Sequence, residues 1–280
     1  MNHSDSFEDL FVEGLHAKIH LITKGKKDGV PIIFLPGITS YSYSFRNILN
    51  KMPDDYYVLS MDPRGRGLSD VPKDGYTLND YSEDLLNVVN AIIDNPHPPF
   101  LVGHSMGARI AAAFGSRYST LISGVVLIDP PINGPGQRPI YPNPLSMFIK
   151  QKEAIDQGEL EVFRSYFPAF TEEQVSERAE EYRNNSLQAI VQSYESLLKE
   201  PFQVNVKMLS VSTLLLVAEH GDTIRENELQ VLKMINPTME TVLVKNVGHM
   251  VYKDAPVETA NYITSFVDKV LKINGRGVLK

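Results

Sequence analysis

The sequence predicts an α/β fold in which helices flank a mostly parallel sheet. Short apolar runs recur along the chain, and most of them end in Gly, Pro or Asp. Amphipathic helical patterns separate several of these runs, and strands that alternate with helices form parallel sheets through right-handed crossovers. Residues 133–207 break this alternation with a polar, helical pattern that contains no strand-like run. We therefore expect a helical cap inserted into the fold.

The apolar runs have the length of fully buried strands. They occupy residues 32–37, 56–62, 100–105, 124–130, 213–219 and 241–249. Residues 11–25 precede them and are apolar at every second position in part of their length, which favours an antiparallel hairpin at the edge of the sheet. Apolar residues at three- and four-residue steps predict helices over 81–93 and 108–117.

The predicted cap divides the chain into a first core segment (1–132), the cap (133–207) and a second core segment (208–280). Helices are expected at 144–157, 159–166, 171–183 and 186–199. The third begins with Thr171 three residues before Gln174, a capping box. Its many Glu residues are most simply a solvated face.

Composition limits the function. The 280 residues are 42% hydrophobic and 22% charged, which is typical of a chain with a large core. There is no cysteine, so disulfides, thiolate metal sites and cysteine nucleophiles are excluded. The net charge of −7 disfavours broad nucleic-acid or membrane-surface binding. No secretory signal or membrane-spanning run is visible, so we expect a cytoplasmic protein that acts on a small molecule; its oligomeric state is left open.

Residues 103–107 (GHSMG) fit the pattern G-x-S-x-G directly after a strand and before a helix. In that context the serine sits on a tight, strained turn, and glycines on both sides prevent collisions. Ser105 is therefore the predicted nucleophile. The backbone N–H of Met106, at the helix N-terminus, is a predicted oxyanion donor.

A nucleophile of this kind requires a second oxyanion donor and a base. Gly37 follows the strand at 32–35 and lets the Ile38 N–H face the same point as that of Met106. His249 follows the last strand, and an imidazole can take and return a proton near neutral pH. We interpret His104 as structural support and His220 as a weaker rival base.

The chain resembles the α/β-hydrolase superfamily over essentially its whole length, with the order Ser, Asp, His. Residues 62–69 (DPRGRGLS) are similar to the D-x-R-G-x-G-x-S loop of that family, and we expect Arg64 and Arg66 to brace it. The resemblance implies an eight-stranded sheet, a cap after the sixth strand and an acyl-enzyme mechanism that needs no cofactor or metal. Pro36 departs from the family, because many members have histidine there.

Two residues compete for the acid of the triad. Most family members carry it after the seventh strand in a G-x-x-D arrangement, and this alignment puts Gly221 in its place, with Asp222 displaced by one residue. Asp129, at the end of the sixth strand, is the position that a minority of the family uses. We favour Asp129 and keep Asp222 as the alternative.

Residues 129–142 (DPPINGPGQRPIYP) look like the corresponding stretch of N-formylmaleamate deformylases of nicotinate degradation, which carry the acid at its first position. This resemblance implies a carboxylate-bearing amide or ester as substrate. Such a substrate needs a fixed cation, for which Arg138 and Arg109 are candidates, although packing or surface ion pairs explain them equally well. Tyr41 could line the pocket or cover the core.

Other functions use the same residues. An esterase, a lactonase or a carbon–carbon bond hydrolase acting on ring-cleavage products would keep the same triad. A non-catalytic receptor could use the capped pocket only for binding small ligands. Substrates alone separate these alternatives.

Overall fold

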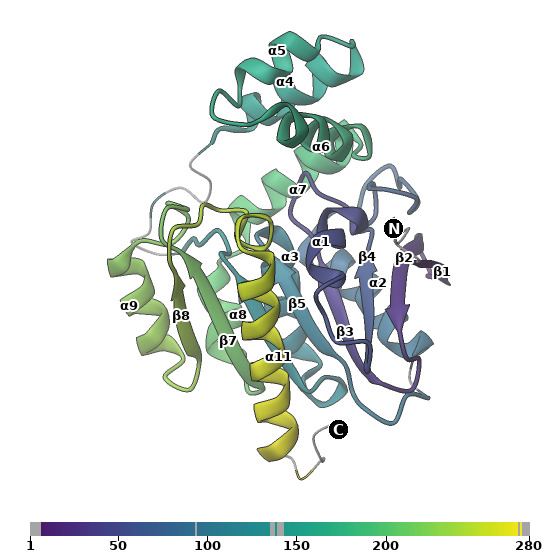
Figure 1. Ribbon diagram of the computed structural model, residues 1–280, viewed down its shortest axis with the longest axis vertical. Helices are drawn as coiled ribbons and strands as arrows, with labels where there is room; N and C mark the ends of the chain where they lie inside the picture. Colours follow the sequence, from purple (N-terminus) through teal and green to yellow (C-terminus); the bar gives the residue numbers. More distant parts are fainter. Residues whose placement is uncertain (1–6, 93, 135–137, 139–142, 274, 276–280) are drawn as a thin grey trace.

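A computed structural model describes residues 7–92, 94–134, 138, 143–273 and 275. The described residues form one eight-stranded sheet with the strand order β1-β2-β4-β3-β5-β6-β7-β8 (Figure 1). β1 and β2 form the predicted antiparallel hairpin at one edge, and every pairing from β4 to β8 is parallel. The strands are β1 (Glu8–Glu13), β2 (Lys18–Gly25), β3 (Val30–Leu35), β4 (Tyr56–Met61), β5 (Phe100–His104), β6 (Gly124–Ile128), β7 (Ser212–Ala218) and β8 (Glu240–Val244).

Alternating side chains of the central strands supply two hydrophobic layers. In β3, Ile33 and Leu35 belong to the layer on one face, whereas Ile32 and Phe34 belong to the layer on the other. All of β3, β4, β5 and β6 is buried, which explains the continuous apolar runs in the sequence. The predicted α/β fold with a mostly parallel sheet is confirmed.

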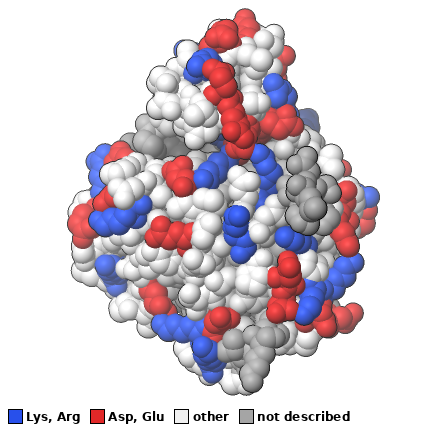
Figure 2. All heavy atoms as spheres, in the orientation of Figure 1, with Lys and Arg blue, Asp and Glu red and all other residues white. Residues whose placement is uncertain are grey.

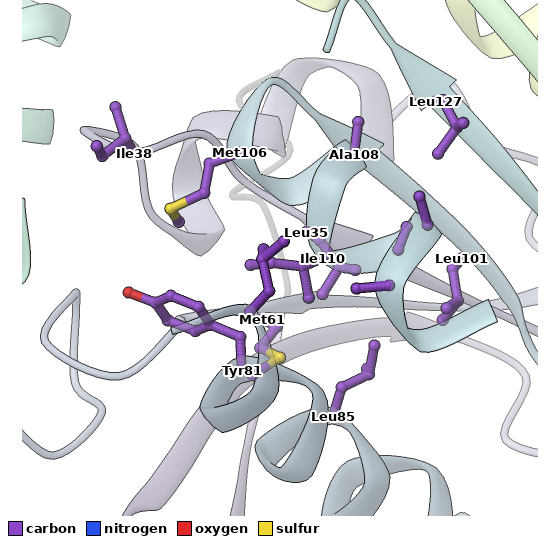
Figure 3. Close-up of a cluster of buried hydrophobic side chains, with 14 of the residues drawn as sticks. Leu35, Ile38, Met61, Tyr81, Leu85, Leu101, Met106, Ala108, Ile110 and Leu127 are labelled. Carbon is purple, nitrogen blue, oxygen red and sulfur yellow. The ribbon is translucent and has the colours of Figure 1, made fainter. Parts of the chain in front are cut away.

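Helices cover both faces of the sheet (Figure 1). α2 and α3 pack against the first layer, which Figure 3 shows with Leu85 of α2 and Ile110 of α3. α1 and α11 pack against the second. The core helices are α1 (Arg46–Leu49), α2 (Leu78–Ala91), α3 (Met106–Arg117), α8 (Phe202–Met208), α9 (Glu226–Ile235), α10 (Val251–Asp254) and α11 (Pro256–Ile273), with 3-10 turns η1 (Ser42–Phe45) and η2 (Ser119–Leu121).

The segment between β6 and β7 contributes four further helices, which lie beyond the carboxyl ends of the parallel strands (Figure 1). They are α4 (Leu145–Asp156), α5 (Leu160–Ser165), α6 (Glu172–Arg183) and α7 (Leu187–Lys199), close to the four expected ranges. The Thr171–Gln174 capping box is present at the start of α6. The loop after β4 meets this segment, because Gly67 N–H donates to the Asn184 carbonyl at 2.7 Å.

Candidate active site

The chain turns sharply at Ser105, between β5 and α3. Its φ of 54° and ψ of −117° lie outside the regions that a non-glycine residue usually adopts. A Cβ on Gly107 would lie 1.9 Å from the Leu35 carbonyl oxygen, and one on Gly103 would lie 2.2 Å from the Gly107 carbonyl oxygen. The two glycines are therefore required by close backbone contacts. The turn is held by a 2.9 Å hydrogen bond from Ser105 N–H to the Ile128 carbonyl.

A carboxylate and an imidazole meet beside this turn. Asp129 follows β6 with a φ of 44°, is fully buried, and places Oδ2 2.7 Å from Nδ1 of His249. Its other oxygen accepts the Ala218 N–H at 3.1 Å. The bond to Nδ1 leaves Nε2 of His249 as the nitrogen that can exchange a proton. Ser105 and His249 line the same cavity.

Two residues of the loop after β7 shape this contact, and sequence reasoning assigned no role to either of them. Thr223 Oγ1 lies 3.1 Å from Nδ1 of His249. A Cβ on Gly221 would lie only 2.6 Å from Oδ2 of Asp129. Gly221 occupies the place where most of the family carries the acid. Because it has no side chain, it leaves room for the carboxylate of Asp129, which follows β6.

Asp222, the alternative acid, is exposed and belongs to a group of surface ion pairs. Its carboxylate pairs with Arg225 at 2.9 Å and with Arg138 at 3.3 Å. The hydrogen bond from Arg225 lowers the pKa of Asp222 below its usual value. The structure therefore brings Ser105, His249 and Asp129 together and leaves Asp222 outside the group.

The other two histidines near the strand ends differ in their surroundings. Nε2 of His104 lies 2.8 Å from the His249 carbonyl oxygen, and the two rings are 4.6 Å apart. Burial, together with the neighbouring His249 charge, holds the pKa of His104 well below 6.5, so its ring is neutral and packs beside that of His249. His220 is exposed beside Glu219 at 3.7 Å and does not line the cavity.

The two predicted oxyanion donors flank the nucleophile. Met106 is the first residue of α3, so its N–H has no acceptor within the helix. Ile38 lines the cavity, and a Cβ on the preceding Gly37 would lie 3.4 Å from the Ser105 Cβ. This glycine allows the loop after β3 to approach the serine closely.

The cavity that Ser105 and His249 line has a volume of about 730 Å³. Its wall combines polar residues of the strand ends with Phe148, Phe167 and Phe170 of the segment between β6 and β7. Figure 2 shows acidic side chains running down this segment toward basic side chains at its base. Arg178 of α6 and Lys253 of α10 are the basic residues in the described wall, beside Glu173, Glu177 and Asp254.

The three side chains predicted to bind substrate are not among the described residues that line this cavity. Arg109 is buried under the segment after β6, donates to the Pro131 and Glu200 carbonyls, and lies over the Phe202 ring. Arg138 pairs with Glu228 at 3.0 Å. Tyr41 is half-buried, and burial raises the pKa of its phenol to about 12.

The Glu-rich pattern of α6 predicts a solvated face, and the structure corrects this prediction at Glu181. Glu181 is buried between two cations, 2.6 Å from Arg178 and 2.7 Å from Lys253. Arg178 also donates to the carbonyl of Thr39, next to Ile38, at 3.2 Å. The helical period places Glu177, Arg178 and Glu181 on one face, but nothing local reveals that this face meets the core.

The chain is similar to several known hydrolases. N-formylmaleamate deformylase of Pseudomonas putida is 28% identical over 235 residues, covering 83% of this chain and 86% of that protein. 2-(Acetamidomethylene)succinate hydrolase of Mesorhizobium japonicum is 36% identical over 112 residues, 40% of each chain. The crystal structure of an N-formylmaleamic acid deformylase variant from Pseudomonas putida S16 superposes with a TM-score of 0.81 at 27% identity, covering 91% of this chain and 100% of the other.

The profile of the alpha/beta hydrolase family matches residues 32–262. This range runs from β3 to α11 and contains the sharp turn at Ser105, Asp129 after β6 and His249 after β8. The chain belongs to the alpha/beta hydrolase family.

Proposed function

We propose that this protein is a serine hydrolase that cleaves a small carboxylate-bearing amide or ester through an acyl-enzyme, with N-formylmaleamate as the first substrate to test. The observation that carries the proposal is the 2.7 Å contact between Asp129 and His249, next to the strained Ser105 turn and a cavity that Ser105 and His249 line. The similarity to N-formylmaleamate deformylase over most of both chains supports the choice of substrate.

In this mechanism Ser105 Oγ attacks the substrate carbonyl and passes its proton to Nε2 of His249. Asp129 holds the imidazole by its Nδ1–H and stabilises the imidazolium without taking the proton. The N–H groups of Ile38 and Met106 bind the oxyanion. His249 then protonates the leaving nitrogen or oxygen, and a water molecule hydrolyses the acyl-enzyme. For an N-formyl amide the acyl group is formyl, and formate is released.

A substrate carboxylate would meet Arg178 and Lys253. Both cations already share Glu181, and three more carboxylates belong to the described wall. The cavity therefore has no large excess of positive charge, and we expect one substrate carboxylate to be favoured over two.

We further propose that the expected segment 133–207, apart from helix α8, which belongs to the core, acts as the cap over this site and that the protein works in the cytoplasm. Among the described residues, none of the helices is both long and apolar enough to span a bilayer.

The test is hydrolysis of N-formylmaleamate beside matched esters, lactones and neutral formamides, by the wild type and by Ser105→Ala. We expect turnover of the carboxylated formamide to fall by about 10⁴-fold or more in the variant, because the nucleophile is lost. If a lactone were hydrolysed faster than the carboxylated formamide, the substrate class would be lactones instead. Binding of these compounds without any turnover that depends on Ser105 would favour a receptor and contradict the proposal.

A further inference from the structure

Arg66 lies where the loop after β4 meets both the loop after β3 and the cap. It occupies a variable position of the 62–69 stretch, and its side chain is only 1% exposed. Its Nε and Nη2 donate to the Ile38 carbonyl at 3.3 and 3.1 Å. Nη2 also lies 3.9 Å from Sδ of Met106. One guanidinium thus contacts both residues whose N–H groups are assigned to the oxyanion.

The remaining partners of Arg66 come from its own loop, from α2 and from the cap. Nη1 donates to the Arg64 carbonyl at 2.9 Å and to the Tyr81 hydroxyl at 2.5 Å. Nη2 donates to the Ser193 hydroxyl of α7 at 3.1 Å. Figure 3 shows Tyr81 near Met106 and Ile38, on the side of the sheet that α2 covers. The guanidinium therefore connects α7 of the cap to the oxyanion loop.

These acceptors are all neutral. Within the described part of the chain, no carboxylate oxygen lies within 4.0 Å of the Arg66 guanidinium, whereas Arg64 in the same loop binds Asp84 through two contacts of 2.6 and 2.7 Å. Buried charges are normally paired with an opposite charge. Neutral hydrogen-bond acceptors and the Tyr81 ring, 5.6 Å from Cζ, replace the hydration of the Arg66 guanidinium, but no described carboxylate neutralises its charge. Its location beside Ile38 and Met106 gives this charge a role.

We propose that Arg66 is a positioning residue for the oxyanion hole, an inference that rests on the proposed function. It fixes the loop at Ile38 through the carbonyl, and its positive charge, which no described carboxylate neutralises, favours the negative charge that develops on the substrate oxygen. An electrostatic contribution of this kind stabilises the transition state more than the bound substrate, so it acts on kcat more than on KM.

The charge is tested without removing Arg66. Ser193→Asp places a carboxylate where the Ser193 hydroxyl accepts from Arg66, and this carboxylate neutralises the Arg66 guanidinium. Ser193→Asn is the control, because an asparagine side chain has nearly the shape of an aspartate but no charge. With an ester or formamide that the wild type hydrolyses, we expect kcat of Ser193→Asp to be about tenfold below that of Ser193→Asn, with KM changed less than about threefold. Equal kcat values in the two folded variants would overturn the electrostatic role.

Positioning is tested by Arg66→Lys and Arg66→Gln against Arg64→Lys, a matched change at a buried arginine in the same loop. We expect kcat to fall about 10- to 100-fold in Arg66→Gln and less in Arg66→Lys, which retains the charge. Arg64→Lys should lower the melting temperature and leave kcat per folded molecule near wild type. Wild-type kcat in both Arg66 variants would overturn the inference alone. A wild type whose turnover does not depend on Ser105 would overturn the proposed function and this inference together.

Discussion

Backbone strain marks the residues at the carboxyl ends of the central strands. Among the described non-glycine residues, Ser105, Asp129, Asp222 and Asn246 have positive φ angles. Such conformations cost about 1–3 kcal/mol each and persist only where the surroundings enforce them. Ser105 and Asp129 are each held by an N–H bond to the neighbouring strand, at 2.9 and 2.8 Å. The strained turns direct the hydroxyl and the carboxylate to the same end of the sheet.

The choice of acid gives a direct prediction. Asp129→Asn should lower kcat by about 10⁴-fold, because the amide can neither fix the reactive tautomer nor stabilise the imidazolium. Asp222→Asn should stay within a few-fold of wild type, since Asp222 contacts Arg225 and Arg138 instead of the imidazole. Steady-state kinetics with the best substrate measure kcat of both variants. If Asp222→Asn proved the crippled variant, the acid assignment would be wrong.

The elbow glycine gives a second prediction. Gly107→Ala should destabilise the fold by about 1–3 kcal/mol or more and reduce activity, because its Cβ would overlap the Leu35 carbonyl. Gly115→Ala in the same helix is the control, since its Cβ would meet the flexible end of Leu209 at 2.9 Å. Chemical denaturation compares the two. Similar midpoints for both variants would mean that the turn can relax around a methyl group.

The contact between α6 and the core depends on one carboxylate. Burial alone would raise the pKa of Glu181, but Arg178 and Lys253 outweigh it and hold the pKa below 4.5. A carboxyl group with a lowered folded-state pKa stabilises the fold above its unfolded value and loses this contribution as the pH falls through the folded value. Docking of α6 should therefore weaken in acid, below about pH 4.5.

Glu181→Gln should lower the unfolding free energy by about 3 kcal/mol, because it leaves two cations without their shared partner. It should also reduce kcat, since Arg178 holds the Thr39 carbonyl beside Ile38. Glu180→Gln is the matched control on the same helix. Its partner Arg183 is exposed, so the expected change is below about 1 kcal/mol. Equal effects of the two changes on urea midpoints would contradict the role of Glu181.

His20 connects the edge hairpin to the loops near the candidate active site. His20 of β2 lies 2.7 Å from Asp62, after β4, and 2.9 Å from Asp9 of β1. Asp62 also accepts the N–H groups of Ser42 and Leu68 at 2.6 and 2.9 Å. A buried imidazole thus joins the first two strands to the loops on either side of the site.

Stability should depend on pH through this imidazole. Burial lowers the pKa of His20, but hydrogen bonds and charges of Asp62 and Asp9 outweigh it and raise the pKa above 6.5. A group with a raised folded-state pKa contributes fully below its unfolded value and loses that contribution as the pH rises through the folded value. We expect the urea midpoint to fall above about pH 6.5 in the wild type and to fall less in His20→Gln. Parallel curves would contradict this linkage.

Much of this architecture follows from local patterns. The apolar runs placed the central strands within a few residues, and the helical periodicity placed α4 to α7. The run at 241–249 was too long, because β8 ends at Val244 and His249 lies on the following loop. Helices α8, α9 and α11 were not among the predicted elements.

The sequence predicts Ser105, its flanking glycines and His249, because a strand, a tight turn and a helix leave a local signature of a few residues. It favours Asp129 as the acid only through a resemblance over residues 129–142. It gives no sign of Thr223 beside the imidazole, of the cations in the cavity wall or of the neutral surroundings of Arg66. Their roles depend on which distant side chains lie within about 3 Å, and burial and charge pairing arise only when β6, the loop after β7, α6 and α7 pack around one cavity.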